Sequence, residues 1–368
     1  MKFLFFLVHP AKFHFHKNQI NTLKKKGHLV DIIIIKKDML EDLVIEEGWN
    51  YKNIFPEGRK INGLHTLISA LISMVRTIYR LWAFTSKKDY DIYVGDLLTV
   101  IGRVRGIPSF YPTDDVFADI YLTDQIFYIP TDFIFAPKIT DMGPYDYKTI
   151  RYDGYKALAH LHPNCFSPDS SKLPSNLKGN SKYFIIRCTG FEATHDLNKH
   201  GITDKMLKEI VNILSTKGDV FISTERKLPE SLKKYQLQIP KRDISHYMFF
   251  ADLFISDSTT MTTEAAVLGT PSIEYDDYFE GIEQMLEIAN KYNLTEGFAP
   301  GCKLEEFYSR IDTLSSMSRN KIEEFRERRT KLLDEKIDVS AFFTWLIENY
   351  PESVSRVKKD SEFQYSFK

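Results

Sequence analysis

The sequence predicts an α/β protein made of two Rossmann-like domains that face each other across a cleft. Short apolar runs alternate with segments of helical spacing, both before and after a polar stretch at 167–182. Buried strands separated by helices are typical of parallel sheets that are covered on both faces. The chain also has 368 residues, which is enough for two domains of ordinary size.

The first half of the chain opens with the apolar run 3–8, which we interpret as a strand. A helix over 15–26 ends at Gly27, and the β-branched run 29–35 predicts the second strand. Apolar residues at helical spacing then predict a long amphipathic helix over 64–84. Shorter strands are predicted at 91–94, 109–111 and 133–135.

The helix over 64–84 has two interpretations. Its apolar face is formed by Leu67, Ile68, Leu71, Ile72, Val75, Ile78 and Leu81. We expect this face to pack on the sheet, and contact with a membrane-bound substrate is the alternative. The segment is interrupted by His65, Arg76 and Arg80, and no stretch of the chain reaches the roughly 20 apolar residues that span a bilayer.

The second half repeats the alternation of strands and helices. The segment 167–182 is polar and lacks periodicity, so it predicts a linker between domains over 1–166 and 183–350. Strands are predicted at 183–186, 219–223, 253–255 and 271–274, and helices at 204–216, 245–251, 281–292, 304–314, 319–335 and 340–348. The last helices are expected to pack back towards the N-terminal domain, and 351–368 to form a frayed tail.

The composition narrows the class of protein. The chain is 43% hydrophobic and 27% charged, which is typical of a globular protein. Lys and Arg number 49 against 50 Asp and Glu, so nothing indicates a nucleic-acid partner. The three cysteines, Cys165, Cys188 and Cys302, are far apart and fit no metal site, which suits a reducing, cytoplasmic location.

The segment 254–273 has the most informative local pattern. An apolar strand is followed by small polar residues at 256–260, and helix formers at 262–268 end at Gly269. The first amides of a helix have no partner inside it and the helix dipole is positive there, so this turn predicts an anion site. Glu264 lies one turn into the helix and suits a pair of ribose hydroxyls. The alternative is an ordinary strand-to-helix turn capped by Ser or Thr.

Histidines and lysines crowd the segment just after the first strand. His9, Lys12, His14, His16 and Lys17 fall within nine residues. Histidine titrates near neutral pH, so one of these rings could act as a general base or bind an anionic group. We favour His14, because His9 directly follows the strand and is expected to be partly buried. The alternative is that these side chains only decorate the first turn of a helix.

Three carboxylates follow two other predicted strands. Asp96 comes after the strand at 91–94, and Asp114 and Asp115 come after the strand at 109–111. Converging carboxylates raise each other's pKa and can divide into an acid and a base. For each aspartate alone, capping of the following helix is the alternative.

Arg187 follows the predicted strand at 183–186, where a guanidinium can bind a diphosphate with two parallel hydrogen bonds. Glu192 and His195 belong to the same loop, and Thr224-Glu225-Arg226 occupies the equivalent place after the next strand. The sequence has no zinc-ligand spacing, Walker loop, Gly-x-Gly-x-x-Gly or Gly-x-Ser-x-Gly. This argues against a nucleotide-hydrolysing motor and a serine hydrolase.

Several segments together resemble a known family. ISDSTTMTTEAAVLGTP is similar to the nucleotide-binding signature of GT-B glycosyltransferases and of hydrolysing UDP-N-acetylglucosamine 2-epimerases. HPAKFHFHKNQINTLKKKGH, IPSFYPTDD, YDGYKALAHLHPNCFSPD and TMTTEAAVLGTP resemble landmarks of a GT-B-like prokaryotic family catalogued as domain of unknown function 354. These segments extend from residue 9 to 271. The family implies two Rossmann-like domains and a place in surface-polysaccharide synthesis.

The resemblance to the 2-epimerases includes the aspartates that follow two of the predicted strands. YVGD at 93–96 is similar to the epimerases' strand-end Gly-Asp, which bears a catalytic carboxylate, and Asp114 or Asp115 falls near their second acidic position. Two features depart from the epimerase pattern. Their Glu followed by Ala-Gly is absent, and their glycine-rich turn is replaced by DSTT at 257–260, whose small hydroxyl residues still leave the amides accessible.

The resemblance implies a glycosyltransferase that uses a nucleotide sugar, with a UDP-linked donor. The backbone at Ser258, Thr259, Thr260 and Met261, and the side chain of Thr259 or Thr260, would then hold the diphosphate, and Glu264 would bind the ribose. Arg187 would neutralise the leaving diphosphate in place of a metal, so we expect neither a metal ion nor a cofactor.

His14, Asp96 or Asp115 would then deprotonate the acceptor hydroxyl, which belongs to a glycan or a lipid-linked glycan. Two other functions stay open. A hydrolysing 2-epimerase needs carboxylates and no acceptor, and a non-catalytic nucleotide-sugar-binding protein needs only the nucleotide site.

Overall fold

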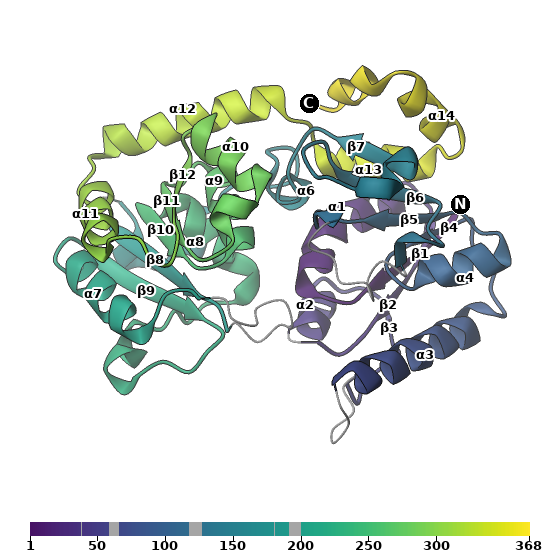
Figure 1. The fold of residues 1–368 in the computed structure, drawn as a ribbon, viewed down its shortest axis with the longest axis horizontal. Helices are drawn as coiled ribbons and strands as arrows, with labels where there is room; N and C mark the ends of the chain where they lie inside the picture. Colours follow the sequence, from purple (N-terminus) through teal and green to yellow (C-terminus); the bar gives the residue numbers. More distant parts are fainter. Residues whose placement is uncertain (38, 59–65, 118–126, 180, 191–199) are drawn as a thin grey trace. The chain divides into compact units, whose positions relative to one another are not determined.

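The protein forms two compact units in a computed structural model that describes residues 1–37, 39–58, 66–117, 127–179, 181–190 and 200–368. The first unit comprises Met1–His160 together with Lys336–Lys368, and the second comprises Leu161–Glu335 (Figure 1). The predicted return of the last helices to the N-terminal domain is therefore confirmed. The chain enters the first unit twice, which the local sequence pattern does not indicate.

The first unit is built on a parallel sheet in the order β3-β2-β1-β4-β5-β6-β7. Its strands are β1 (Lys2–Leu7), β2 (Leu29–Ile34), β3 (Lys52–Asn53), β4 (Ile92–Val94), β5 (Ser109–Pro112), β6 (Phe133–Pro137) and β7 (Thr149–Tyr152). β1 is fully apolar apart from Lys2 and is buried from Phe3 onwards, as expected for a central strand. The strand order reverses between β1 and β4, and ligands of open α/β sheets bind beyond the carboxyl ends of the strands at such a point.

The helices of the first unit are α1 (Pro10–Lys25), α2 (Leu40–Glu46), α3 (Thr66–Thr85), α4 (Leu98–Arg105), α6 (Leu158–Leu161), α13 (Val339–Glu348) and α14 (Glu352–Lys359). α13 packs against α1, where Phe343 contacts Phe15 with their ring centroids 6.1 Å apart. The prediction of a frayed tail over 351–368 is wrong. α14 is followed by a 3₁₀ segment at Ser361–Phe367 whose Phe363 and Phe367 pack on Trp345.

The prediction that the apolar face of the 64–84 helix packs on the sheet is also wrong for most of that face. Within α3, Leu81 is buried, but Ile68, Leu71, Ile72 and Val75 are exposed. Leu67 belongs to α3 but lies outside the side chains that the structure describes. Among the described residues, no helix is both long enough and apolar enough to cross a membrane.

The second unit contains a parallel sheet in the order β12-β11-β10-β8-β9. Its strands are β8 (Tyr183–Cys188), β9 (Asp219–Thr224), β10 (Leu253–Ser256), β11 (Ser272–Tyr275) and β12 (Thr295–Phe298). Its helices are α7 (Asp204–Ser215), α8 (Ile244–Phe250), α9 (Thr259–Leu268), α10 (Glu283–Asn290), α11 (Leu304–Ser315) and α12 (Arg319–Glu335). The strand order reverses between β8 and β10, so these two carboxyl ends mark the expected ligand edge.

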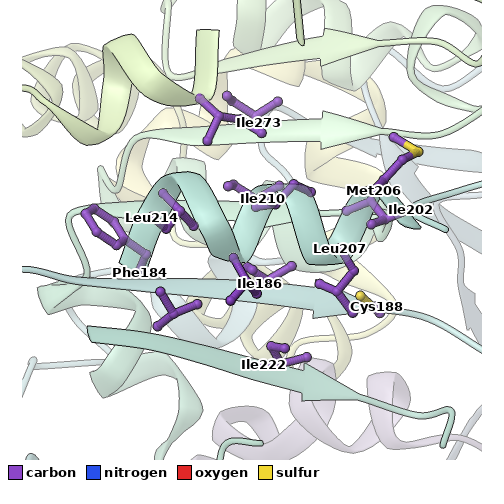
Figure 2. Close-up of a cluster of buried hydrophobic side chains, with 14 of the residues drawn as sticks. Phe184, Ile186, Cys188, Ile202, Met206, Leu207, Ile210, Leu214, Ile222 and Ile273 are labelled. Carbon is purple, nitrogen blue, oxygen red and sulfur yellow. The ribbon is translucent and has the colours of Figure 1, made fainter. Parts of the chain in front are cut away.

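The core of the second unit shows why α7 forms where the sequence predicts it. Met206, Leu207, Ile210 and Leu214 recur at helical spacing and point onto the sheet, where Ile186 lies beneath them (Figure 2). Thr203 caps the helix, because its side chain accepts a hydrogen bond from the amide of Met206. Burial of this apolar face fixes α7 on the sheet and so helps to fix the strands whose ends carry the candidate site.

The predicted domain boundaries differ from the observed ones. The polar segment 167–182, predicted as a linker, lies within the second unit, where it forms 3₁₀ turns at Ser170–Lys172 and Ser175–Leu177. Leu173 and Leu177 anchor it, since both side chains are buried. Two leucines spaced among Ser, Pro and Lys are too few to give a periodic signal, so the sequence pattern resembled that of a free linker.

Candidate functional site

The segment after β1 is helical rather than a loop. α1 begins at Pro10, whose fixed φ suits the first position of a helix, and His9 caps it by accepting a hydrogen bond from the amide of Ala11 at 3.1 Å. His14 lies in the second turn of α1, partly buried, with its ring centroid 5.3 Å from that of His160. His16 is buried, and burial lowers its pKa to about 3 despite a 2.6 Å hydrogen bond to Gln19. His16 is therefore neutral and structural.

Charged side chains lie at the carboxyl edge of the sheet in the first unit, where an ion pair joins the loops after β5 and β7. The Lys156 ammonium lies 2.7 Å from Oδ1 of Asp114, and the two side chains are 25% and 29% exposed. Burial alone would raise the pKa of Asp114, but the charge of Lys156 and its hydrogen bond outweigh burial and lower it. Asp114 is thus held ionised and occupied, which makes it a poor general base.

Asp114 pairs directly with Lys156, and Asp115 and Asp96 act on this lysine only through their charges. Burial would lower the pKa of this lysine, but the charges of Asp114, Asp115 and Asp96, in that order, raise it. Asp96 does not cap α4, because the N-cap position is Leu97 and no side chain caps that helix. Asp115 exchanges hydrogen bonds with Thr113, whose hydroxyl donates to its carboxylate and accepts from its amide, each at 3.2 Å. The sequence predicts these acids at two strand ends, and in the structure they lie after β4 and β5, which are neighbours in the sheet.

A second lysine completes this edge. Nζ of Lys12, on the first turn of α1, donates to the backbone oxygen of Pro112 at 2.6 Å and lies 5.0 Å from the ring centroid of Tyr111. A small pocket opens here, lined by the two lysines, Asp114 and the ring of Tyr152 among others. The site thus offers hydrogen-bond acceptors and cations to a polar ligand.

In the second unit, the turn between β10 and α9 is held by a buried aspartate. Asp257 accepts hydrogen bonds from the amides of Thr189, at 2.7 Å, and Ile202, at 3.1 Å. Burial raises its pKa to about 6, and these two amide bonds and the charge of Arg226 limit the rise. Asp257 therefore fixes the turn from below and does not face a ligand.

The N-terminus of α9 presents the predicted anion site. The amide of Ser258 is already used, because it donates to Oγ of Ser256 at 2.8 Å. The amides of Thr259, Thr260 and Met261 have no acceptor in the part of the chain that the structure describes. Thr260 is exposed, and Glu264 is four residues further along and thus on the same face of the helix.

The hydroxyl of Thr259, by contrast, points to a pair of buried acids. It donates to Oε1 of Glu274 at 2.8 Å and lies 3.5 Å from Oδ2 of Asp276. Burial, followed by the charge of Asp276 and a hydrogen bond to it, raises the pKa of Glu274 well above its usual value. Oε2 of Glu274 has no donor within the described residues, as expected of an acid that keeps its own proton. Of the two predicted threonine hydroxyls, only that of Thr260 faces outward.

Glu274→Gln is expected to make the protein more stable than wild type, by a margin that widens as pH rises. The folded pKa of Glu274 lies above its unfolded value of 4.5. The stabilisation that the protonated Glu274 carboxyl contributes is complete below pH 4.5. It is lost at up to about 1.4 kcal/mol per pH unit as pH rises from there towards the folded pKa. Glutamine keeps the acceptor for Thr259 and does not titrate. Urea unfolding of both proteins from pH 5 to 8 tests this, and a constant difference would contradict it.

Arg187 is the last predicted residue, and it lies at the carboxyl end of β8 beside β10, where it pairs with Ser256 in the sheet register. Its guanidinium donates to Oγ of Ser223 at 3.0 Å and to the carboxylate of Glu225, and its side chain is 15% exposed. Nε is buried and has no acceptor in the described chain. An anion at the edge would therefore compete with Glu225 for this guanidinium.

A family model described as "Protein of unknown function (DUF354)" matches residues 5–293. The chain belongs to this family. No curated protein matches the sequence significantly.

Solved structures resemble this DUF354 protein over nearly its whole length. A co-structure of MnaA from S. aureus with UDP has a TM-score of 0.65 at 13% identity, covering 96% of this chain and 98% of that one. The UDP-GlcNAc 2-epimerase from Neisseria meningitidis, bound to UDP-GlcNAc, has a TM-score of 0.62 at 13% identity, covering 97% and 100%. The calicheamicin glycosyltransferase CalG4 has a TM-score of 0.59 at 11% identity, covering 97% and 99%. The fold is therefore GT-B.

Two residues of the DUF354 chain, Lys156 and Glu274, were not predicted as site residues from the sequence. Lys156 lies within a segment that resembles a family landmark and was given no role, although it pairs with the predicted acid Asp114. Glu274 was predicted only as part of a strand, although its carboxyl engages Thr259 at the first turn of α9. Arg226 was placed at a strand end, and its guanidinium donates to the backbone oxygen of Ile202. Glu192 and His195, by contrast, lie outside the described residues. The signal available for Glu274 was a charged residue inside an apolar strand, and the signal for Lys156 was a charged residue next to a tyrosine.

Proposed function

We propose that this DUF354 protein is a glycosyltransferase that transfers a sugar from a nucleotide donor, with UDP as the nucleotide. The second unit binds the donor and the first unit supplies the groups that act on the acceptor. The acceptor is a glycan or a lipid-linked glycan, and the reaction belongs to the cytoplasmic synthesis of a surface polysaccharide or another glycoconjugate.

The observation that carries this proposal is the N-terminus of α9. Three consecutive amides without acceptors in the described chain, an exposed hydroxyl and a carboxylate one turn further lie beyond β10, next to the strand-order reversal. Such a helix end binds phosphate groups, since the amides and the dipole both favour negative charge. The relatives in fold include one bound to UDP and one bound to UDP-GlcNAc, which supports a uridine diphosphate as the ligand.

In this mechanism, the amides of Thr259, Thr260 and Met261 and the hydroxyl of Thr260 bind the diphosphate, and Glu264 binds the ribose. A bond forms between the acceptor oxygen and the anomeric carbon as the bond from that carbon to the diphosphate breaks. Negative charge then develops on the diphosphate, and Arg187 stabilises it after exchanging Glu225 for the leaving group.

The proton of the acceptor hydroxyl passes to a base of the first unit. Asp114 is held by Lys156, which leaves His14, Asp96 and Asp115 as the candidates. His14 and Asp115 are not among the residues that line the small pocket, although neighbours of each in the chain are. Mutation of each candidate in turn is therefore needed to identify the base.

Glu264→Ala is expected to raise the dissociation constant for UDP by roughly tenfold, because a charge-assisted pair of hydrogen bonds to the ribose is lost. The unfolding temperature should stay close to that of wild type. The matched control is Glu283→Ala, which removes an exposed carboxylate from the start of α10 in the same unit. Isothermal titration calorimetry measures both affinities, and an unchanged affinity in the Glu264 variant would remove Glu264 from the site.

A hydrolysing 2-epimerase is the second candidate, because several relatives in fold are epimerases and because carboxylates follow β4 and β5, two neighbouring strands of the first sheet. Incubation with UDP-N-acetylglucosamine alone distinguishes the two functions. Release of free N-acetylmannosamine identifies an epimerase, whereas a transferase turns over only with an acceptor. Nucleotide binding without turnover in a broad screen of donors and acceptors would indicate a non-catalytic binding protein.

A further inference from the structure

The helix α3 presents a continuous apolar stripe away from the core of the first unit. Six bulky side chains are between 36% and 71% exposed: Ile68, Leu71, Ile72, Val75, Tyr79 and Trp82. At 100° per residue they fall within an arc of about 100°, which is the width of a typical buried helix face. Single exposed apolar residues are ordinary, but a continuous stripe of this kind marks a surface that binds something.

The opposite face of α3 packs on the core of the first unit through partly buried Met74, Ile78 and Phe84, and it also carries small polar side chains. Ser73, Thr77 and Thr85 are buried together with Leu81. The hydroxyls satisfy themselves within the helix, since Thr77 donates to the backbone oxygen of Ser73 at 2.6 Å and Thr85 to that of Leu81 at 2.9 Å. The helix therefore has apolar residues on its outer side as well as its inner side, and folding alone does not account for the outer ones.

The charges around the stripe indicate what covers it. α3 packs beside α4 (Figure 1), and together the two helices carry four arginines and no acidic residue. Arg76 and Arg80 lie along one side of the stripe and share Glu57 as an ion-pair partner. Lys87, just after α3, and Arg103, on α4, are exposed. A second copy of this face would bring cations against cations, but an anionic surface would attract them.

The residue types fit the interface of a bilayer. Tyr79 and Trp82 have amphipathic rings of the kind that gather at the level of lipid headgroups, and the aliphatic residues could enter the acyl boundary. α3 spans 20 residues, and its inner face is packed on the unit, so it would lie along the surface rather than cross it.

We propose that α3 docks the first unit onto a bilayer containing anionic lipids, with its apolar stripe inserted among the headgroups. This binding needs neither a nucleotide sugar nor an acceptor. Its test is therefore independent of the proposed transferase activity.

Sedimentation with vesicles tests the proposal on the full chain. Wild type should bind vesicles of equal parts phosphatidylglycerol and phosphatidylcholine, and should bind pure phosphatidylcholine much more weakly. The double variant L71S/V75S should lower the partition by roughly tenfold or more, because two inserted side chains are lost. The matched control I45S/Y147S removes two exposed apolar residues of the same unit outside α3 and should bind like wild type.

Tryptophan fluorescence provides a second readout. Emission should shift to shorter wavelength when vesicles are added, and W82F should lose that shift, since Trp49 is buried against Phe13 and Trp345 packs on Phe363 and Phe367. Equal binding of L71S/V75S and wild type would overturn the proposal. So would a wild-type dimer that dissociates in L71S/V75S and does not sediment with vesicles, because the stripe would then be a contact between copies.

Discussion

Thr260→Asp is expected to abolish UDP binding and to leave the protein at least as stable as wild type. Thr260 is exposed in the first turn of α9, next to amides without acceptors in the described chain. A carboxylate there would occupy the place of the diphosphate and repel it, which should weaken binding by more than roughly a hundredfold. The same charge would stabilise the helix N-terminus by about 0.3–1 kcal/mol.

Because UDP affinity should fall while stability does not, the two measurements distinguish loss of the binding site from loss of the fold. Thr260→Asn is the matched control, because it has nearly the shape of aspartate without its charge and should retain most of the affinity. Calorimetry with UDP and thermal unfolding measure the two effects. Wild-type affinity in the aspartate variant would show that the diphosphate lies elsewhere, and an equal loss in the asparagine variant would contradict the electrostatic explanation.

Most strands of both sheets could be predicted from sequence because they are short apolar runs, but β3, β7 and β12, which are not, were missed. β1, β8 and β10 were expected within a residue or two of their observed bounds, and with them the turn before α9. Side-chain identity then placed Arg187, Asp96 and Asp115 at strand ends. Parallel strands present their carboxyl ends at one edge, so the position of Asp96 and Asp115 at the same edge of the first sheet follows from topology.

The features that could not be predicted depend on partners distant in the chain. The helical spacing of Leu71 and Val75 reveals an apolar face, but the direction of that face depends on the buried hydroxyls of Ser73 and Thr77 opposite. Lys156 pairs with an aspartate 42 residues earlier. Neither the outward direction of the stripe on α3 nor this ion pair leaves a local periodic signal.

Lys156→Met is expected to lower the free energy of unfolding at pH 7 by about 1–3 kcal/mol, because Asp114 would be left partly buried without its hydrogen-bonded cation and with only the more distant charge of Lys12. We place the loss below that of a fully buried pair, since about a quarter of each side chain is exposed and water screens the charges. Turnover should fall with it, since the three acids would lose the positive charge of Lys156.

The pH dependence gives the sign. Lys156 lowers the folded pKa of Asp114, so that aspartate's contribution is present above its unfolded pKa of 3.8 and is lost as pH falls through the lower, folded value. The pKa of Lys156 is raised above 10.5, so the lysine's contribution is present below that value and is lost only as pH rises beyond it. The stability difference between wild type and Lys156→Met should therefore be largest near neutral pH and should shrink towards acid pH.

The double variant K156M/D114N distinguishes a structural role from a functional one. Removing the stranded charge should restore most of the stability, because both partners of the pair are then neutral. Turnover should stay low, since Asp96 and Asp115 still lack the ammonium. Urea unfolding from pH 4 to 8 and steady-state kinetics measure both. Recovery of turnover together with stability would show that Lys156 serves only to hold the loops after β5 and β7 together.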